Sequence, residues 1–423
     1  MTRVFPVHGL VFGLVLLAAG PTALAEDWPR FRGPAGMGVA TEQELPLEFS
    51  PDKNLAWKTR LPGAGASSPV LWGDRIYLTA HTGYAVPGEE GGSLDQLQRL
   101  LLCLDRKSGK ILWTQSVPAK LPEEPTIREG HGYTASTPAV DAAGVVVFFG
   151  KSGVLAFDHE GKEQWRADVG EGTNGWGSAA SPIFYQDRVI ISASVESESL
   201  VSLDRATGKE LARASGIREA WNTPVVVVNP RGEHELIVPI IEKVLAFDPL
   251  SLAPLWSCDT DIPWYMVPSV VARDGIVYSI GGRPGGGLAI RTGGRGDVTS
   301  TERLWTSRKG GNVSSPVLHG EHLYWMHDNL GIAFCASLAT GELAYEQRLQ
   351  RAGMVYASAL LVGDRIYYIT REGRVFVVRA APKFELLATN DLNDRSVFNA
   401  SPAAADGRLY VRSDAWLYCF GKK

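Results

Sequence analysis

The chain has 423 residues, of which 45% are hydrophobic and 21% are charged, and this balance excludes a disordered chain. Its 12 Trp and 13 Tyr, beside 46 Gly and 25 Pro, indicate a packed core with many turns. A net charge of −4, from 42 basic and 46 acidic residues, gives no electrostatic basis for binding nucleic acid or an anionic membrane surface.

The first 25 residues have the pattern of a cleavable secretory signal. Arg3 supplies the positive charge, residues 10–19 form an apolar run too short to span a bilayer, and Ala23-Leu24-Ala25 is a cleavage site. No cysteine lies at the cleavage point, so no lipid anchor is expected. We therefore expect a periplasmic or secreted protein with no membrane span, beginning at Glu26.

The four cysteines form no metal-binding or redox motif, because no two of them have C-x-x-C spacing. Most lie inside apolar runs, which predicts small buried thiols. They are Cys103, Cys258, Cys335 and Cys419.

A short motif, two small or polar residues followed by Pro and an apolar run, recurs along the mature chain at intervals of about 43 residues. The first interval is longer, because it holds an insertion around residues 81–99. Clear copies are Ser67-Ser68-Pro69, Ser136-Thr137-Pro138, Ala180-Ser181-Pro182, Asn222-Thr223-Pro224, Ser314-Ser315-Pro316 and Ala400-Ser401-Pro402, with weaker copies at Ser269 and Ala359.

Each repeat predicts four strands. A strand led by Pro, a tight turn and a β-branched second strand are followed by a third strand that ends in Asp. A turn with Ser-Gly or Thr-Gly then precedes a fourth strand that often carries Trp, as in Asp105 to Trp113. We expect the Asp to accept hydrogen bonds from turn N–H groups, the Gly to adopt positive φ, and the Trp to cover the neighbouring sheet.

Four strands per unit and eight units predict an all-β fold, an eight-bladed β-propeller of four-stranded antiparallel blades. The last unit has only three strands, and the missing strand stands before the first unit, at residues 54–60. We expect this N-terminal strand to close the last blade, which would remove the free sheet edges. Residues 26–53 would form an N-terminal strap, and the propeller would span residues 54–423.

These repeats resemble those of the PQQ (pyrroloquinoline quinone) propeller superfamily. Its docking motif, A-x-D-x-x-T-G-x-x-x-W, is matched closely by CLDRKSGKILW at 103–113 and, except for the final Trp, by SLDRATGKELA at 202–212. The resemblance implies eight blades and includes two kinds of protein: quinoprotein alcohol dehydrogenases, and BamB, a lipoprotein of outer-membrane β-barrel assembly.

Over nearly the whole mature chain, the sequence is similar to exported PQQ-like propellers of uncharacterised function. The strings that carry this similarity are WPRFRGPAGMG (28–38), GWGSAASP (175–182), GGRPGGGLAIRTGGRGDV (281–298) and SVFNASPAAADGRLYVRSDAWLYCFG (396–421). The similarity supports the fold and leaves the activity open, because one fold hosts many functions.

Three departures weigh against quinone chemistry. Quinoprotein dehydrogenases are larger, many carry a pair of adjacent cysteines over the cofactor, and they bind Ca²⁺ through oxygen ligands on inner loops. Here no two cysteines adjoin, and no clear set of Asp, Asn and Glu supplies such ligands. We therefore expect no cofactor, with PQQ and calcium kept as the alternative.

Loops that enter the innermost strands of a propeller surround one end of its channel, and here they carry aromatic rings and amides. Such a set suits a flat ligand, a sugar or a peptide segment. Packing between blades or against the strap is the alternative. The candidates are His131, Tyr133, Trp176, Trp221, Asn222, Trp264, Tyr265, Asn312, Tyr356 and Asn399.

Two other groups are interpreted as structural. The Gly-rich stretch Gly281–Gly296 contains arginines, but no helix follows it, so we expect unusual hairpin turns with ion-paired Arg. His319 and His322 flank a two-residue turn, whereas His327 points to the opposite face of its strand, so we expect no metal site.

The sequence contains no nucleophile elbow, zinc-protease or P-loop motif, so we predict no catalytic residues. Our first hypothesis is an exported, monomeric binding or scaffolding propeller for a protein or polysaccharide of the cell envelope. The insertions 81–99 and 115–131 are candidate partner loops. The alternatives are a PQQ-dependent dehydrogenase and an outer-membrane protein assembly factor.

Overall fold

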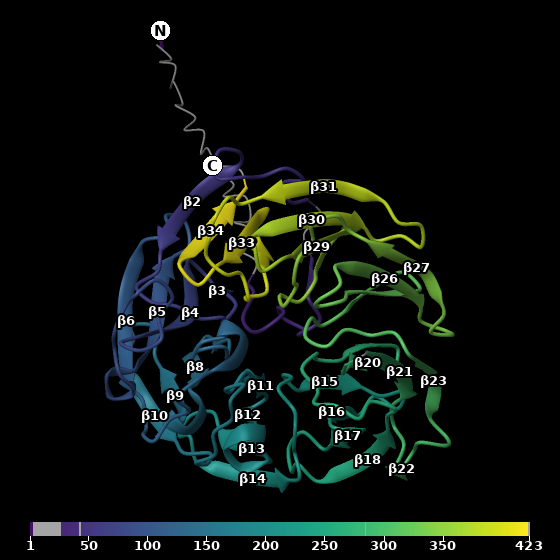
Figure 1. Cartoon of the computed structure of the whole chain (residues 1–423). Coiled ribbons are helices and arrows are strands. Elements are labelled where there is room, and N and C mark those ends of the chain that lie inside the picture. Colours follow the sequence, from purple (N-terminus) through teal and green to yellow (C-terminus); the bar gives the residue numbers. More distant parts are fainter. Residues whose placement is uncertain (3–26, 42–43, 284, 422–423) are drawn as a thin grey trace.

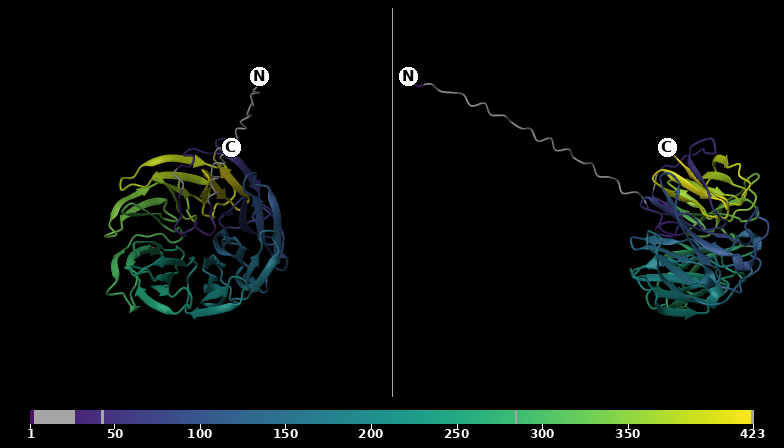
Figure 2. Two further views of the ribbon diagram at one scale, coloured as in Figure 1. Left: turned by 180° about the vertical axis from the view of Figure 1, so that it is seen from behind. Right: turned by 90° about the vertical axis from the view of Figure 1, so that its left-hand side faces the viewer.

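The computed structural model describes residues 1–2, 27–41, 44–283 and 285–421. These residues form a ring of eight β-sheets arranged in sequence order around a central axis (Figures 1 and 2). Within the described ranges, helical structure is limited to α1 (Ser194–Ser197) and the 3₁₀ turns η1 (Leu94–Gln96), η2 (Arg128–Gly130) and η3 (Gly150–Ser152). The prediction of an all-β, eight-bladed propeller is confirmed. The predicted signal lies, apart from its first two residues, outside the described residues.

The first four blades each contain four antiparallel strands, counted from the inner strand outward. Blade 1 has β3 (Val70–Trp72), β4 (Arg75–Thr82), β5 (Gln98–Asp105) and β6 (Ile111–Pro118); blade 2 has β7 (Ala139–Asp141), β8 (Gly144–Phe148), β9 (Val154–Phe157) and β10 (Glu163–Ala167). Blade 3 has β11 (Ile183–Tyr185), β12 (Arg188–Ala193), β13 (Ser199–Asp204) and β14 (Glu210–Ser215); blade 4 has β15 (Val225–Val228), β16 (His234–Ile240), β17 (Lys243–Phe247) and β18 (Pro254–Asp259).

The next three blades repeat the pattern, and two of the eight sheets gain a short parallel strand. Blade 5 has β19 (Val271–Arg273), β20 (Ile276–Gly281), β21 (Gly286–Arg291) and β23 (Arg303–Ser307). Blade 6 has β24 (Val317–His319), β25 (His322–Met326), β26 (Ile332–Ser337) and β27 (Leu343–Arg348). Blade 7 has β28 (Leu360–Val362), β29 (Arg365–Ile369), β30 (Arg374–Arg379) and β31 (Leu386–Asp391). The added strands are β22 (Gly296–Asp297), outside β18, and β1 (Val39–Ala40), beside β28.

Blade 8 joins the two ends of the propeller. Its inner strands are β32 (Ala403–Ala405), β33 (Arg408–Arg412) and β34 (Trp416–Phe420), and its outer strand is β2 (Leu55–Arg60). The antiparallel register pairs Leu55 with Phe420 and Arg60 with Trp416. Figure 1 shows the purple β2 beside the yellow β34. The predicted closure by residues 54–60 is therefore confirmed.

The recurring small residues of the repeats form a closed ring of hydrogen bonds around the channel. In every blade, the backbone N–H of one Ser or Thr donates to the hydroxyl of the equivalent residue in the next blade, at 2.9–3.1 Å. These bonds satisfy buried N–H groups and link each blade to its neighbour. The members of this hydroxyl ring, in order, are Ser68, Thr137, Ser181, Thr223, Ser269, Ser315, Ser358 and Ser401.

The hydroxyl ring also defines the register of the two weaker repeats. Ser269 occupies the hydroxyl position, so Val270 takes the place of the proline. In blade 7 the hydroxyl belongs to Ser358, and Ala359 replaces the proline.

The Asp-to-Trp segments connect the outer strands of successive blades. The Asp105 carboxylate accepts the N–H of Ser108 at 2.7 Å, and Gly109 has φ +72°, as the motif predicts. The Trp113 ring lies against Gly161 in the turn of blade 2, and its Nε1 donates to the carbonyl of His159 at 3.0 Å. The tryptophan thus covers the turn of the neighbouring sheet. Trp165 and Trp305 make the same kind of contact with the next blade.

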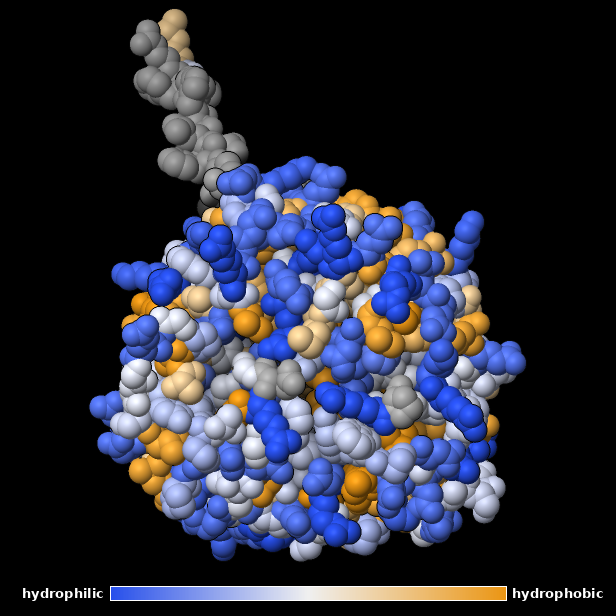
Figure 3. Space-filling model, in the orientation of Figure 1, coloured by the Kyte–Doolittle hydropathy of each residue, from blue (hydrophilic) through white to orange (hydrophobic). Residues whose placement is uncertain are grey.

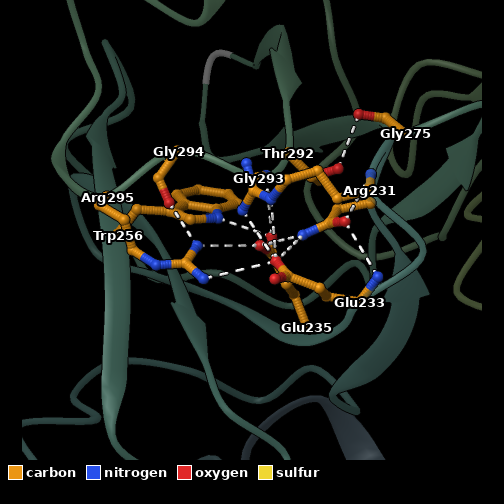
Figure 4. Close-up of polar contacts among 10 residues, drawn as sticks. Arg231, Glu233, Glu235, Trp256, Gly275, Thr292, Gly293, Gly294 and Arg295 are labelled. Carbon is orange, nitrogen blue, oxygen red and sulfur yellow. Dashed lines mark hydrogen bonds and ion pairs between the residues drawn. The ribbon is translucent and has the colours of Figure 1, made fainter.

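The contact between blades 4 and 5 differs, because the turn of blade 5 lacks this motif. The Trp256 Nε1 donates at 2.7 Å to the carboxylate of Glu235, a fully buried residue of its own blade (Figure 4). The same carboxylate oxygen accepts the N–H of Gly293 in blade 5 at 3.2 Å. Asn229 donates to the other oxygen at 2.9 Å, so the buried charge is satisfied.

Apolar side chains from facing sheets fill the spaces between blades. In the described residues they form seven buried clusters, such as Leu101 and Cys103 of blade 1 against Val147 of blade 2. Because each blade is covered on both faces, its middle strands are apolar almost throughout. The four cysteines are free and buried, as predicted.

The described residues before the closing strand contact the blades in two parts: residues 27–41 pack on inner strands, and Leu47 and Phe49 bond to Asn390 of the outer strand β31. Trp28 pairs with Leu71 of β3, the Pro29 carbonyl accepts the N–H of Val140, and β1 adds to β28. Arg32 is 2% exposed and donates to the Met37 carbonyl at 2.9 Å and to the carbonyl of Pro316. Through these contacts the strap joins blades 1, 2, 6 and 7.

Candidate functional site

A cavity of about 130 Å³ lies at the centre of the ring, where the loops enter the inner strands. Seven of the eight residues of the hydroxyl ring line it, and Phe31 of the strap contributes to its wall. Small residues of the repeats, including Ala66, Ala135 and Ala179, leave this space open. We call this space the first cavity.

The structure brings seven of the ten candidate residues together around the first cavity. Each comes from the loop before the inner strand of a different blade, from blade 2 to blade 8. They are His131, Trp176, Trp221, Tyr265, Asn312, Tyr356 and Asn399.

The other three candidates do not line the first cavity, although Tyr133 lines a neighbouring cavity described below. Tyr133 is buried, and its hydroxyl donates to the Glu124 carbonyl at 2.7 Å. Asn222 is buried and donates to the Pro239 carbonyl at 2.7 Å, so it holds the loop of blade 4. Trp264 is 38% exposed beside Tyr265, outside the cavity lining.

Five aromatic rings form a continuous arc along the cavity wall. His131 stacks on Tyr356 with a centroid distance of 5.4 Å and lies 6.3 Å from Trp176. Tyr265 lies 5.9 Å from Trp176 and 5.5 Å from Trp221. The arc presents several ring faces to one space, which suits a ligand with flat apolar faces.

The amides in the first cavity have unused hydrogen-bonding capacity. Asn312 is 2% exposed, and neither its side-chain oxygen nor its nitrogen has a partner among the described residues. The Asn399 oxygen is also unpartnered, whereas its nitrogen donates to the Gly130 carbonyl at 3.2 Å. A buried amide without partners is costly, so these groups are positioned to bind something in the cavity.

Arg283 lines the first cavity, and Arg128 and Arg371 lie over aromatic residues of its wall, a position that we call its mouth. The guanidinium of Arg128 lies 5.4 Å from the Trp176 ring centre, and that of Arg371 lies 4.5 Å from Tyr356. Arg283, from the Gly-rich turn after β20, also lines the cavity. Burial, assisted by the nearby Arg371 charge, lowers the pKa of His131 to about 4, so its ring is neutral at neutral pH.

A second cavity, of about 310 Å³, adjoins the first and shares His131 and Asn399 with it. Tyr84 and Pro87 of the 81–99 insertion and Ile127 of the 115–131 insertion line it. Both insertions thus contribute to a space beside the channel mouth.

The first cavity does not fit the calcium and quinone arrangement of the dehydrogenases. A general base and hard cation ligands require carboxylates, and no described residue lining this cavity is Asp or Glu. More broadly, the described residues contain no group of three or more His, Cys, Asp or Glu that could hold a metal ion. His319 and His322 are register partners across their turn, and His327 lies 3.3 Å from Asp328.

Other arginines of the Gly-rich stretch have acidic neighbours: Arg291 lies 3.5 Å from Glu302, and Arg295 lies 3.5 Å from Glu233. Figure 4 shows this outer cluster, in which Arg231 also pairs with Glu233. Arg283 differs, because it reaches the first cavity. The expectation of ion-paired turns therefore holds for only part of the stretch.

Sequence reasoning missed the cavity residues Phe31 and Arg283. Phe31 belongs to the strap, whose path no repeat pattern predicts. Arg283 lies in a turn that was interpreted as purely structural. The hydroxyl ring had a signal, the recurring Ser or Thr before Pro, although its convergence on the channel was not recognised.

The surface seen in the orientation of Figure 1 is mixed in character. Hydrophilic side chains dominate it, and apolar side chains lie in small separate groups (Figure 3). Among the described residues, no helix is long and apolar enough to cross a membrane.

One family model, described as outer membrane protein assembly factor BamB, matches residues 86–229. This segment covers part of blade 1, blades 2 and 3, and the inner strand of blade 4. No curated protein matches the sequence.

Several solved structures share the fold at low sequence identity. BamB from Moraxella catarrhalis is 15% identical, with a TM-score of 0.62, over 87% of this chain and 97% of that one. A europium-containing methanol dehydrogenase is 12% identical, with a TM-score of 0.65, over 94% and 98%. Quinohemoprotein alcohol dehydrogenase from Comamonas testosteroni is 12% identical, with a TM-score of 0.63, over 94% and 81%.

Proposed function

We propose that this member of the PQQ-like β-propeller superfamily is a non-catalytic binding protein of the cell envelope that holds a polysaccharide in its first cavity. The observation that carries the proposal is Asn312, an amide with both polar atoms unpartnered in a buried, aromatic-lined space. A ligand that exchanges hydrogen bonds with this amide would remove its desolvation cost.

The chemistry of the lining favours a sugar. A pyranose has a flat apolar face and a rim of hydroxyl groups, and the first cavity offers aromatic faces beside amides. The second cavity adjoins the first through His131 and Asn399, so successive units of a chain have room on both sides. This continuity supports a polymer over a single small molecule.

A peptide that binds by strand addition is less well suited to this site. Such a peptide needs unpaired backbone N–H groups along a sheet edge. At the first cavity, the eight N–H groups of the hydroxyl ring already donate to the neighbouring blade. Lower in the channel, the edge of β28 is occupied by β1 of the strap.

Placement in the envelope, in the periplasm or outside the cell, is proposed from the secretory pattern of residues 1–25. An outer-membrane protein assembly factor remains the second candidate, because the family model with that description matches residues 86–229. That segment contains the whole 115–131 insertion and most of the 81–99 insertion, so a protein partner would be expected on those loops instead of in the first cavity.

The test is calorimetric titration of the mature protein with defined oligosaccharides from envelope and extracellular polysaccharides. We expect saturable binding of at least one of them, and a loss of about tenfold in affinity for Asn312→Ala, because the amide hydrogen bonds are removed. Asn329→Ala, which alters an exposed amide, is the matched control and should bind like the unmodified protein.

Two outcomes would overturn the proposal, one from this titration and one from a parallel titration with PQQ in the presence and absence of Ca²⁺. One is the absence of binding to any oligosaccharide. The other is saturable, Ca²⁺-dependent binding of PQQ at one molecule per chain, which would favour the dehydrogenase alternative.

A further inference from the structure

We propose that the first cavity selects acidic sugars, and that Arg128 and Arg283 determine this specificity by binding a carboxylate or sulfate group of the polysaccharide. The inference rests on the proposed function and names the chemical class of its ligand. It starts from the arginines at the mouth of the cavity.

Two of these arginines are held by aromatic rings of the cavity wall. Arg128 lies over Trp176, and Arg371 lies over Tyr356, with guanidinium carbon to ring-centre distances of 5.4 and 4.5 Å. The guanidinium of Arg128, beside an aromatic face, keeps its N–H edge available for hydrogen bonding. Such an edge matches the two oxygens of a carboxylate or sulfate.

Charge balance at the site is unlike that of the outer surface. On the outer strands and turns, arginines such as Arg213 and Arg379 pair with carboxylates at 2.7 Å. Among the described side chains, neither Arg128 nor Arg283 has a carboxylate partner, and no Asp or Glu lines the first cavity. Among the described residues that line the first cavity, the side chain charged at neutral pH is Arg283, in a chain whose net charge is −4.

The neutral groups of the cavity complete the ligand description. His131 is uncharged at neutral pH, so the positive charge at the mouth comes from guanidinium groups. The unpartnered Asn312 amide suits a sugar hydroxyl. The expected ligand therefore carries its acidic group at the rim and its ring among the aromatic side chains.

The experiment compares each acidic ligand with a neutral counterpart in which the charged group is esterified or removed. We would titrate the mature protein with a tetramer of galacturonic acid and with its methyl ester, and with a sulfated galactan oligosaccharide and its desulfated form. We expect each acidic ligand, or one of the two, to bind about tenfold more tightly than its neutral counterpart. Its affinity should fall as salt rises, while that of the neutral form should not.

Arg128→Gln and Arg283→Gln should each weaken binding of the acidic ligand about tenfold and leave binding of its neutral form unchanged. Arg60→Gln is the matched control, because Arg60 also lies over an aromatic ring, 5.6 Å from Trp416, on the outer strand β2. Thermal unfolding of each variant checks that the fold is retained.

Equal affinity for acidic and neutral forms would overturn the inference, as would variants that weaken both forms alike. In either case the proposed polysaccharide function would stand. If no oligosaccharide of either kind binds, the proposed function itself fails, and the two failures are thereby distinguished.

Discussion

At the scale of single residues, the buried acid Glu196 is the clearest case of a group whose charge opposes folding. It lies in α1, is 5% exposed, and accepts a hydrogen bond from the Ser178 hydroxyl. Burial raises the pKa of Glu196 to about 7, from an ordinary value of 4.5, although the Ser178 bond favours the charged form. At neutral pH and above, the protein therefore contains an ionised carboxylate with little solvation.

This predicts a pH-dependent gain of stability for Glu196→Gln. Because the folded-state pKa is raised, the folded protein holds the proton more tightly between pH 4.5 and about 7, and stability is lost as pH rises through that window. The variant lacks this loss, so its free energy of unfolding should exceed that of the unmodified protein by up to about 3 kcal/mol at pH 8. At pH 4.5 the two should be similar.

Urea denaturation at both pH values measures the difference, and Glu198→Gln, at an exposed position two residues away, is the control. The buried histidines His81 and His131, whose pKa values burial lowers to about 4, destabilise both proteins equally on acidification. A gain of the same size at both pH values would contradict the assignment to ionisation.

At the scale of elements, the outer strands are joined by a tryptophan of one blade on a turn glycine of the next. Trp57 of β2 lies against Gly109, where an added Cβ would be 2.4 Å from the indole ring. Glycine is therefore required at position 109 for two reasons: the backbone has a positive φ of +72°, and the indole ring leaves no room for a Cβ. Both follow from the position of the turn under the neighbouring blade.

Gly109→Ala should therefore destabilise the protein by about 2–4 kcal/mol, as the sum of backbone strain and overpacking. Gly73→Ala separates the two effects, because Gly73 has φ +55° in the same blade but no atom within 4 Å of an added Cβ. It should cost only about 1 kcal/mol. Denaturant midpoints of both variants provide the measurement, and equal losses would show that the tryptophan contact contributes nothing.

At the scale of the whole molecule, the ring depends on closure between the two ends of the propeller. Hydrogen bonds of the hydroxyl ring link Ser401 of blade 8 to Ser68 of blade 1 at 3.1 Å, and β2 pairs with β34. These contacts join residues more than 300 positions apart, so opening the ring exposes two sheet edges at once. The free energy of unfolding of the whole propeller should therefore depend on the contacts that close the ring.

A disulfide across the closing strands tests this view. Arg60 and Trp416 are register partners on β2 and β34, and directly opposed strand residues have the spacing that a disulfide requires. We expect Arg60→Cys with Trp416→Cys, once oxidised, to raise the free energy of unfolding by up to about 4 kcal/mol. The reduced form of the same variant is the control, and mass spectrometry verifies the bond. Identical unfolding of the oxidised and reduced forms would show that closure is not limiting.

The sequence alone predicted the blades, the closing strand and seven of the residues that meet at the first cavity. These features depend on local patterns: period-two strands, turns with Asp and Gly, and a repeat of nearly constant length. A loop that precedes an inner strand must lie near the channel in any propeller, so the place of Trp176 or Asn312 follows from the repeat.

Only the tertiary structure decided which of these side chains share one space. Tyr133, Asn222 and Trp264 come from the same loops as the cavity residues but do not line the first cavity, because their hydrogen bonds and exposure depend on neighbouring loops. Tyr133 lines the second cavity instead. Phe31 reaches the cavity from the strap, outside the repeats, and Arg283 from a glycine turn of blade 5 that the repeat motif does not specify. Their convergence is set by packing across the ring, between segments far apart in the chain, and no local sequence pattern contains that information.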